Sequence, residues 1–226
     1  MASYDSRYEK YIGPKISKLT KETTEEEIKK LYKDWATEYD KEVKGAAKIA
    51  YHEPMAKALD AAFKQVFQDK TQSQIKIIDA GAGTGLAGVE LFELGYTNID
   101  ALDISQEMLN EAKKKDIYKK LICAPLTEKR IPEIQTGEYH ALISTGALVI
   151  AHVQPEALGE MTRMVKPGGL LCFTMRDVDV AEYEEKMLEL EKAGRWQSFS
   201  KEVIPFSDNE DLPQETNGLI FRVLKN

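Results

Sequence analysis

The sequence predicts an α/β fold: seven strands form one mostly parallel sheet with an antiparallel last strand, and helices cover both faces. Three observations support this fold. From Gln74 onward, short β-branched or apolar runs alternate with helical patterns. Before that residue, the apolar residues recur only at helical spacing. The segment SDNEDLPQETN, which separates the last two strands, contains no helical pattern, so those two strands should pair antiparallel.

Residues 1–70 are predicted to form a helical N-terminal extension. Thr23 or Thr24 can cap a helix whose first turn is acidic. That helix has one apolar and strongly aromatic stripe, made of Ile28, Leu31, Tyr32, Trp35 and Tyr39. A second helix is expected from about residue 46 to 67, with a bend at Pro54 because proline interrupts the hydrogen-bond ladder.

Residues 71–226 are predicted to form one compact unit with right-handed crossovers. The strands are expected at Ile75–Asp79, Asn98–Asp103, Lys119–Ala124, Tyr139–Thr145, Gly169–Met175, Phe199–Ile204 and Gly218–Leu224. The helices between them are expected at Leu86–Leu94, Gln106–Lys115, Pro155–Val165 and Ala181–Ala193.

Composition and charge exclude several classes of protein. The longest apolar run, Ala147–Ala151, is far shorter than the roughly 20 residues of a membrane-spanning helix. The first residues form no secretory signal, so we expect a cytoplasmic protein. A net charge of −7 disfavours a nucleic-acid partner, because phosphates require a clustered basic face. Cys123 and Cys172 lie in apolar runs and are expected in the core rather than in a disulfide. The oligomeric state stays open.

The most informative segment is IKIIDAGAGTGL, which reads as a strand, a glycine-rich turn and the start of a helix. Such a turn brings backbone amides close to a ligand at the carboxyl end of the first strand. From Gly83 the sequence also matches the dinucleotide pattern G-x-G-x-x-G, and Asp103 follows Gly83 by twenty residues, where a ribose-binding carboxylate is expected. The motif alone therefore leaves two cofactor classes open.

The charge around this turn favours a cationic cofactor over a dinucleotide. A pyrophosphate is anionic and is disfavoured near a carboxylate, yet Asp79 ends the first strand and points into the turn. No lysine or arginine lies between Ile77 and Gly95 to offset that charge. S-adenosylmethionine carries a sulfonium and an ammonium group and lacks phosphate, so it suits the turn better.

Three segments, taken together, resemble the successive motifs of the class I S-adenosylmethionine-dependent methyltransferases. They are the glycine turn from Asp79 to Gly85, the segment LDIS leading into Met108 and Leu109, and the segment VKPGGL from Val165. The resemblance extends over about residues 28–224. It implies a Rossmann-like methyltransferase sheet, an enzyme that uses S-adenosylmethionine and releases S-adenosylhomocysteine, and N-terminal helices that act as a lid.

The resemblance also implies which residues bind the cofactor. Gly81 and Gly83 would let the backbone approach it, Asp79 would face its cationic end directly or through water, and Asp103 would bind both ribose hydroxyls. A second role for Asp103, as a cap of the helix that follows, also fits its position. The full implied set is Tyr39, Asp79, Ala80, Gly81, Gly83, Asp103, Ile104, Met108, Leu126 and Thr145.

The sequence departs from the family pattern at two places. After the third strand, many members carry an Asp-Ala pair that meets the adenine amino group, but this chain has Cys123-Ala-Pro-Leu126. Adenine recognition would then fall to backbone groups and Leu126. After the fourth strand, the chain lacks the Asn/Asp-Pro-Pro-Tyr/Phe motif of enzymes that methylate exocyclic amines or glutamine amides. Its absence counts against those acceptors.

On the acceptor side, the aromatic stripe would place Tyr32 and Trp35 near the methyl group, although it also fits simple packing of the extension. His152, in the loop after the fourth strand, could take a proton from the acceptor. Arg176, at the end of the fifth strand, could hold an acidic acceptor. The scattered histidines and cysteines indicate no metal site.

We therefore predict methyl transfer to a small-molecule acceptor by in-line displacement. The acceptor itself does not follow from the sequence. Two alternatives stay open at this point: an NAD-linked oxidoreductase, and a non-catalytic partner protein that binds S-adenosylmethionine.

Overall fold

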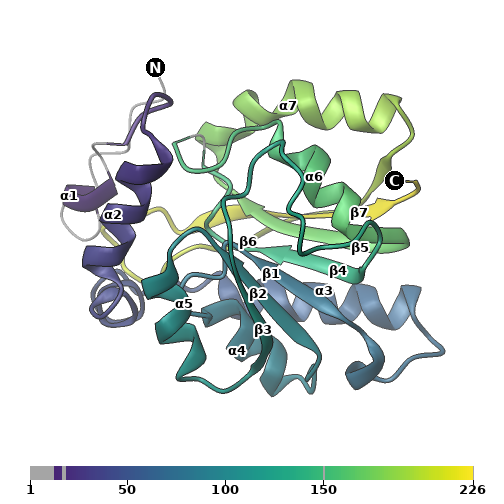
Figure 1. The fold of residues 1–226 in the computed structure, drawn as a ribbon, viewed down its shortest axis with the longest axis horizontal. Coiled ribbons are helices and arrows are strands. Elements are labelled where there is room, and N and C mark those ends of the chain that lie inside the picture. The colour runs from purple at the N-terminus through teal and green to yellow at the C-terminus, as the bar shows by residue number, and fades with distance from the viewer. Residues whose placement is uncertain (1–12, 17–18, 150, 226) are drawn as a thin grey trace.

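The computed structural model describes residues 13–16, 19–149 and 151–225 (Figure 1). These residues form one seven-stranded sheet with the strand order β3-β2-β1-β4-β5-β7-β6. The strands are β1 (Ile77–Ala80), β2 (Ile99–Asp103), β3 (Tyr118–Cys123), β4 (Tyr139–Ser144), β5 (Val165–Met175), β6 (Trp196–Pro205) and β7 (Glu215–Val223).

The pairing of the strands confirms the predicted topology. Strands β1 to β5 are parallel to one another, whereas β7 lies antiparallel between β5 and β6. The chain order reverses between β1 and β4, because β1 leads outward to β2 and β3 on one side and β4 begins the other side. In such a sheet, ligands bind at the carboxyl ends of the strands beside this switch point.

Helices cover both faces of the sheet, as predicted (Figure 1). One face packs against α3 (His52–Val66), α4 (Leu86–Glu93) and α5 (Gln106–Lys113), and the other against α6 (Ala157–Met164) and α7 (Asp177–Lys192). Alternate strand residues divide between the two layers: Ile77 belongs to the α3 and α4 side, and Ile78 to the α6 and α7 side. No helix among the described residues is long and apolar enough to cross a membrane.

The N-terminal segment contains α1 (Gly13–Ile16), α2 (Glu25–Trp35) and the π-helix η2 (Lys41–Ala46). Thr24 caps α2 in a reciprocal capping box with Glu27, so of the two candidate threonines it is Thr24 that begins the helix. The helix α3 lies on the sheet, beside β5 and α4, although its residues fall within the predicted extension.

The prediction of one helix over residues 46–67 with a bend at Pro54 was wrong. Helix α3 begins only at His52, because Ile49 forms a β-bridge with Ser207 and Ala50 N donates to Phe206 O. Pro54 lies in the first turn of α3, where backbone N–H groups have no partner within the helix and the missing donor causes no kink.

Three further differences have local causes. Strand β5 begins four residues before the predicted Gly169, because the backbone continues through the KPGG segment with an irregular register against β4. Helix α7 starts at Asp177, earlier than predicted, because its first turn, DVDV, alternates acidic and apolar residues and so lacks the apolar spacing of a helix. Cys123 was expected in the core but is exposed, since it ends the edge strand β3; Cys172 is buried as expected, and both are free thiols. A short 3-10 helix, η3 (Gln72–Gln74), precedes β1.

Candidate active site

The glycine loop follows β1 and lies between the ends of β2 and β4. Gly81 adopts a positive φ of 73°, and a Cβ atom there would lie only 2.4 Å from Cβ of Ala147. A side chain at this position would therefore clash with the segment that follows β4. Gly81 is required for the close approach of these two segments, which together form the floor of a cavity.

Asp103, the last residue of β2, is held by two backbone donors. Its Oδ2 atom accepts from Gly83 N at 2.8 Å, and its Oδ1 atom accepts from Ser105 N at 2.8 Å. The cap of α5 is Ser105, whose hydroxyl accepts from Met108 N, so Asp103 is not the cap. Burial raises the pKa of Asp103, and the two backbone N–H groups oppose this shift. The side chain is thus fixed with its carboxylate in the cavity wall.

Asp79 lies beneath the glycine loop rather than in the cavity. Its carboxylate is buried and accepts a hydrogen bond of 2.6 Å from the Tyr118 hydroxyl. Burial raises the pKa of Asp79 to about 7, and the bond from Tyr118 opposes this shift. The resemblance implied that Asp79 faces the cationic end of the cofactor, directly or through water. The structure places the carboxylate on the α4 side of the sheet, against Tyr118, because successive strand side chains alternate.

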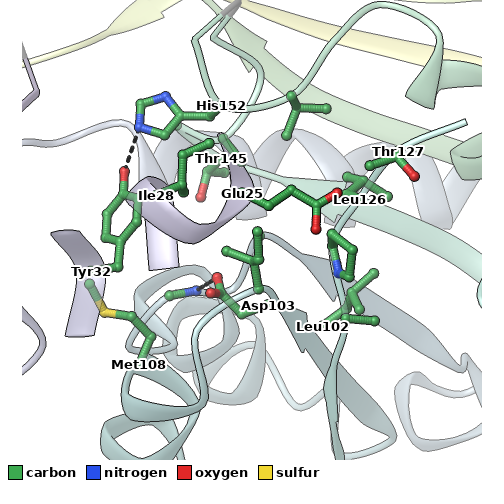
Figure 2. A pocket seen from close by; sticks show the side chains of 18 of the residues that line it. Glu25, Ile28, Tyr32, Leu102, Asp103, Met108, Leu126, Thr127, Thr145 and His152 are labelled. Carbon is green, nitrogen blue, oxygen red and sulfur yellow. Dashed lines mark hydrogen bonds between the residues drawn. The ribbon is translucent and has the colours of Figure 1, made fainter. Parts of the chain in front are cut away.

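The first cavity lies at the carboxyl ends of β1, β2, β3 and β4, and has an empty volume of about 750 Å³ (Figure 2). Among the described residues, its lining contains two carboxylates, on Glu25 and Asp103, and no lysine or arginine. It is lined by Glu25, Ile28, Tyr32, Tyr39, Gly81, Gly83, Leu102, Asp103, Ile104, Met108, Ala124, Pro125, Leu126, Thr127, Thr145, Gly146, Ala147, His152 and Val153.

Aromatic side chains of the N-terminal segment form part of the wall of this cavity: Tyr32 and Tyr39 line it. Trp35 packs edge-on against Tyr39 with ring centroids 4.7 Å apart, and Tyr32 stacks on Trp35 at 6.0 Å. Burial, together with the nearby carboxylates of Asp103 and Asp40, raises the pKa of the Tyr39 phenol, which therefore stays neutral.

An ionic contact joins this segment to the glycine loop. Asp40 accepts a hydrogen bond from the Thr84 hydroxyl and pairs with Lys115, whose Nζ atom lies 2.7 Å from Asp40 Oδ2. Lys115 Nζ also donates to the Thr84 carbonyl at 2.7 Å. A cation thus reaches the loop from a distant part of the sequence, but Asp40 neutralises it and it does not line the cavity.

A second cavity lies next to the first, with an empty volume of about 650 Å³. The two share Tyr32, Tyr39, Gly146 and His152, so these residues form the boundary between them. The second cavity is lined by Ile16, Tyr32, Trp35, Tyr39, Val43, Ile49, Tyr51, Gly146, Leu148, Val149, His152, Thr174, Arg176, Phe206 and Thr216.

His152 lies at this boundary with one ring nitrogen bonded to Tyr32. Its Nε2 atom is 2.8 Å from the Tyr32 hydroxyl, as Figure 2 shows. Its Nδ1 atom is buried and has no hydrogen-bond partner. Burial, with a contribution from Arg176, lowers the pKa of His152 to about 4, so the imidazole is neutral at physiological pH.

The structure brings together most of the residues selected from the sequence. Ten of them line the first cavity: Tyr32, Tyr39, Gly81, Gly83, Asp103, Ile104, Met108, Leu126, Thr145 and His152. Trp35 and Arg176 line only the second cavity, and Asp79 and Ala80 line neither. Among the described residues, no group of three or more His, Cys, Asp or Glu side chains is arranged to hold a metal ion.

Sequence reasoning missed Glu25 and Thr127. Glu25 belongs to the acidic first turn of α2, where an acid is explained by the helix dipole alone, so nothing in the sequence marks it as a cavity residue. Thr127 directly follows Leu126 and also lines the cavity, but the family pattern points to the position of Cys123 and so gave no signal for it.

Comparison with known proteins identifies the family. A model of the methyltransferase domain matches residues 77–169. The chain is 32% identical over 171 residues to the human methyltransferase-like protein 27, a match that covers 74% of this chain and 66% of that protein. The chain belongs to the class I S-adenosylmethionine-dependent methyltransferases.

Other relatives of this methyltransferase agree with that assignment. The malonyl-[acyl-carrier protein] O-methyltransferase of Pectobacterium atrosepticum is 28% identical over 130 residues, which cover 56% of this chain and 49% of that protein. The alignments thus span at most about two thirds of these two relatives.

Solved structures share the fold of the methyltransferase at low sequence identity. Magnesium protoporphyrin IX methyltransferase from Synechocystis, solved with bound S-adenosylmethionine, has a TM-score of 0.61 and 12% identity over 88% of this chain and 96% of that one. The [4+2]-cyclase SpnF has a TM-score of 0.63 and 13% identity over 90% and 98% of the two chains. Since a cyclase also has this fold, the fold alone does not identify the reaction.

Proposed function

We propose that this methyltransferase binds S-adenosylmethionine in the first cavity and transfers its methyl group to a small molecule in the second. The observation that carries the proposal is the pair of adjoining cavities, which meet at Tyr32, Tyr39, Gly146 and His152. A donor in one and an acceptor in the other would meet at that boundary, where alignment can supply most of the acceleration.

The lining of the first cavity fits the cofactor. Asp103 offers two acceptor oxygens, each already oriented by a backbone N–H, for the two ribose hydroxyls. Ile104, Met108 and Leu126 offer apolar contacts for adenine, and Thr127 adds a hydroxyl. The two carboxylates, with no lysine or arginine in the lining, favour a cationic cofactor over one that carries phosphates.

The residues of the lid would exclude water and face the sulfonium. S-adenosylmethionine supplies a methyl group that is already activated by its sulfonium. The aromatic faces of Tyr39 and Tyr32 suit this cation, and Trp35 packs behind Tyr39. We retain His152 as the group that takes a proton from the methyl acceptor, and Trp35 and Tyr32 as residues that contact the methyl acceptor. We retain Asp79 as a carboxylate beneath the loop that acts on the cofactor through its electrostatic field.

A small-molecule acceptor is supported by the position of the second cavity, which adjoins the first and has a largely aromatic and aliphatic lining. The name of the bacterial relative describes methyl transfer to an oxygen, which makes oxygen one candidate acceptor atom here.

The predictions that the protein is cytoplasmic, that residues 1–70 form a helical extension that acts as a lid and that nucleic acid is not a partner stay predictions.

The dinucleotide alternative loses its support. The third glycine of its motif, Gly88, leaves room for Tyr118, since a Cβ atom there would lie 2.1 Å from the Tyr118 hydroxyl. The third glycine of a dinucleotide motif has the same packing role, so Gly88 does not distinguish the two cofactors. The described cavity lining does, because it contains two carboxylates and no lysine or arginine to bind a pyrophosphate. The alternative of a non-catalytic cofactor-binding protein predicts binding without turnover.

Turnover is tested with S-adenosylmethionine that carries a labelled methyl group, incubated with the protein and cell extract. We expect label in the low-molecular-weight fraction, loss of this label in Asp103→Asn, and normal labelling in the control Asp69→Asn, whose side chain is 81% exposed. Label only in the protein fraction would contradict a small-molecule acceptor. Cofactor binding without any labelled product would favour the non-catalytic alternative.

A further inference from the structure

The walls of the second cavity define which acceptor it can hold. We propose that it binds an uncharged, largely aromatic molecule that carries one hydroxyl or thiol group, and that this group meets Nδ1 of His152. The inference rests on the proposed function and deepens it, because it names the class of acceptor for the same site.

The body of the acceptor is indicated by the aromatic side chains that line the cavity from three segments of the chain. The N-terminal segment contributes Tyr32, Trp35 and Tyr39, and the segments that precede α3 and follow β6 contribute Tyr51 and Phe206, whose rings lie 5.4 Å apart. Aliphatic residues fill much of the remaining wall. Flat apolar rings gain most from such walls, through burial of apolar area and through ring contacts.

The charge of the acceptor is constrained by the one charged side chain among the described residues of the lining. This side chain is Arg176, and its guanidinium is paired with the fully buried Asp179 through two contacts, Nε–Oδ2 at 2.5 Å and Nη2–Oδ1 at 3.0 Å. None of the lining residues that the structure describes carries a carboxylate. A carboxylate acceptor would compete with Asp179, and an ammonium acceptor would find no counter-charge, so burial of either is unfavourable.

The polar group of the acceptor is indicated by hydrogen-bond satisfaction. Thr174 Oγ1 accepts from Gly146 N at 2.8 Å, and Thr216 Oγ1 donates to Met175 O at 3.1 Å. Four buried side-chain atoms of the described residues have no hydrogen-bond partner, and of these only His152 Nδ1 belongs to a residue of this cavity. One hydroxyl or thiol of the acceptor would satisfy that atom.

The contact with Tyr32 fixes what His152 can do. When Nε2–H donates to the Tyr32 hydroxyl, the lone pair of the imidazole lies on Nδ1. In the transfer, the O–H or S–H bond of the acceptor breaks and its proton passes to Nδ1. The acceptor atom forms a bond to the methyl carbon, and the electron pair of the broken S–CH₃ bond stays on the cofactor sulfur. The positive charge moves from the sulfonium to the imidazole, so the net charge of the buried site is unchanged.

Calorimetry on the full chain saturated with S-adenosylhomocysteine tests the inference with ligands that share one ring system. The probes are 2-naphthol, 2-naphthoate, naphthalen-2-ylmethylammonium and naphthalene, titrated at neutral pH. We expect 2-naphthol to bind at least about tenfold more tightly than each of the other three, and His152→Leu to reduce its affinity to that of naphthalene.

The outcomes separate this inference from the proposed function. Failure of S-adenosylhomocysteine to bind would overturn the proposed function. Binding of S-adenosylhomocysteine, combined with tighter binding of 2-naphthoate or of the ammonium probe, would overturn only the acceptor class. Absence of binding by all four probes would also overturn it. The comparison among probes uses the unaltered chain, so it stands even where His152→Leu fails to fold.

Discussion

At the scale of single residues, two carboxylates beside the glycine loop have different environments and therefore different roles. Asp103 accepts from two backbone N–H groups and faces the cavity. Asp79 is buried beneath the loop against Tyr118. Asp103 is positioned to bind a ligand directly. Asp79 can affect a ligand only through its electrostatic field and by supporting the conformation of the loop.

Asp103→Asn should weaken binding of S-adenosylhomocysteine at least about tenfold, which corresponds to about 1.4 kcal/mol. An amide can accept from only one of the two backbone N–H groups, and its own NH₂ group opposes the other. Calorimetric titration measures the change, with Asp69→Asn as the control of equal chemistry at an exposed position. Equal affinity of the two variants would show that Asp103 does not contact the cofactor.

Asp79 should make the folded protein less stable as pH rises. Its pKa is about 7 when folded and 3.8 as the reference value, so between about pH 4 and pH 7 the folded state keeps a proton that the unfolded chain releases. The free energy of unfolding therefore falls across this window, by up to about 4 kcal/mol for a shift of about three pKa units.

Urea unfolding of the wild type and of Asp79→Asn at pH 5 and pH 8 tests this linkage. The variant should lose much of the pH dependence of the unfolding free energy, because its amide still accepts the Tyr118 hydrogen bond but does not titrate. An unchanged difference between pH 5 and pH 8 would place the titration in another group.

At the scale of elements, the contact of α4 with β3 explains a glycine that resembles a cofactor motif. Gly88→Ala should destabilise the fold by roughly 1–3 kcal/mol, because the new Cβ atom overlaps the Tyr118 hydroxyl. Gly159→Ala in α6 should instead stabilise it by about 0.4–1 kcal/mol, since nothing lies within 4 Å of that Cβ position. Denaturant unfolding of both variants checks the pair, and similar effects at the two sites would contradict the packing argument.

The contact between the lid and the loop should act on cofactor affinity. Lys115→Met removes the cation that joins Asp40 to the Thr84 carbonyl, and should weaken S-adenosylhomocysteine binding about tenfold, in line with about 1.5 kcal/mol for a charged hydrogen bond. Lys114→Met is the matched control, because the Lys114 side chain is 68% exposed and its only ion pair among the described residues is with the nearby Glu111 of α5. Titration calorimetry of both variants measures the difference; equal losses would mean that the lid closes without this contact.

At the scale of the whole molecule, the sequence predicts the number and order of the strands well, because each strand contains a local β-branched or apolar run, although the first residues of β5, β6 and β7 were predicted three or four positions too late. The strand, turn and helix around Gly81 are examples, and the position of Asp103 at the end of β2 follows from the same pattern. Long-range pairing is harder to predict. The β-bridge of Ile49 to Ser207 prevents the helix from beginning before His52, and no residue near Ile49 in the sequence indicates that contact.

The site residues also divide into those that local motifs predict and those that depend on long-range contacts. Residues on strand ends, such as Asp103 and Thr145, could be assigned from the motifs. Groups that arrive from distant segments could not: Lys115 reaches Asp40 across 75 positions, and Tyr118 reaches Asp79 across 39. The lack of a partner for His152 Nδ1 depends on packing around the whole ring, so only the structure shows it.

The central claim is that the first cavity binds a cationic, phosphate-free cofactor. Calorimetric titration of the full chain with S-adenosylhomocysteine and, separately, with NADH tests it most directly. The structure predicts saturable binding of S-adenosylhomocysteine at one site per chain, weakened in Asp103→Asn, and no binding of NADH. Saturable NADH binding with no heat from S-adenosylhomocysteine would contradict the account.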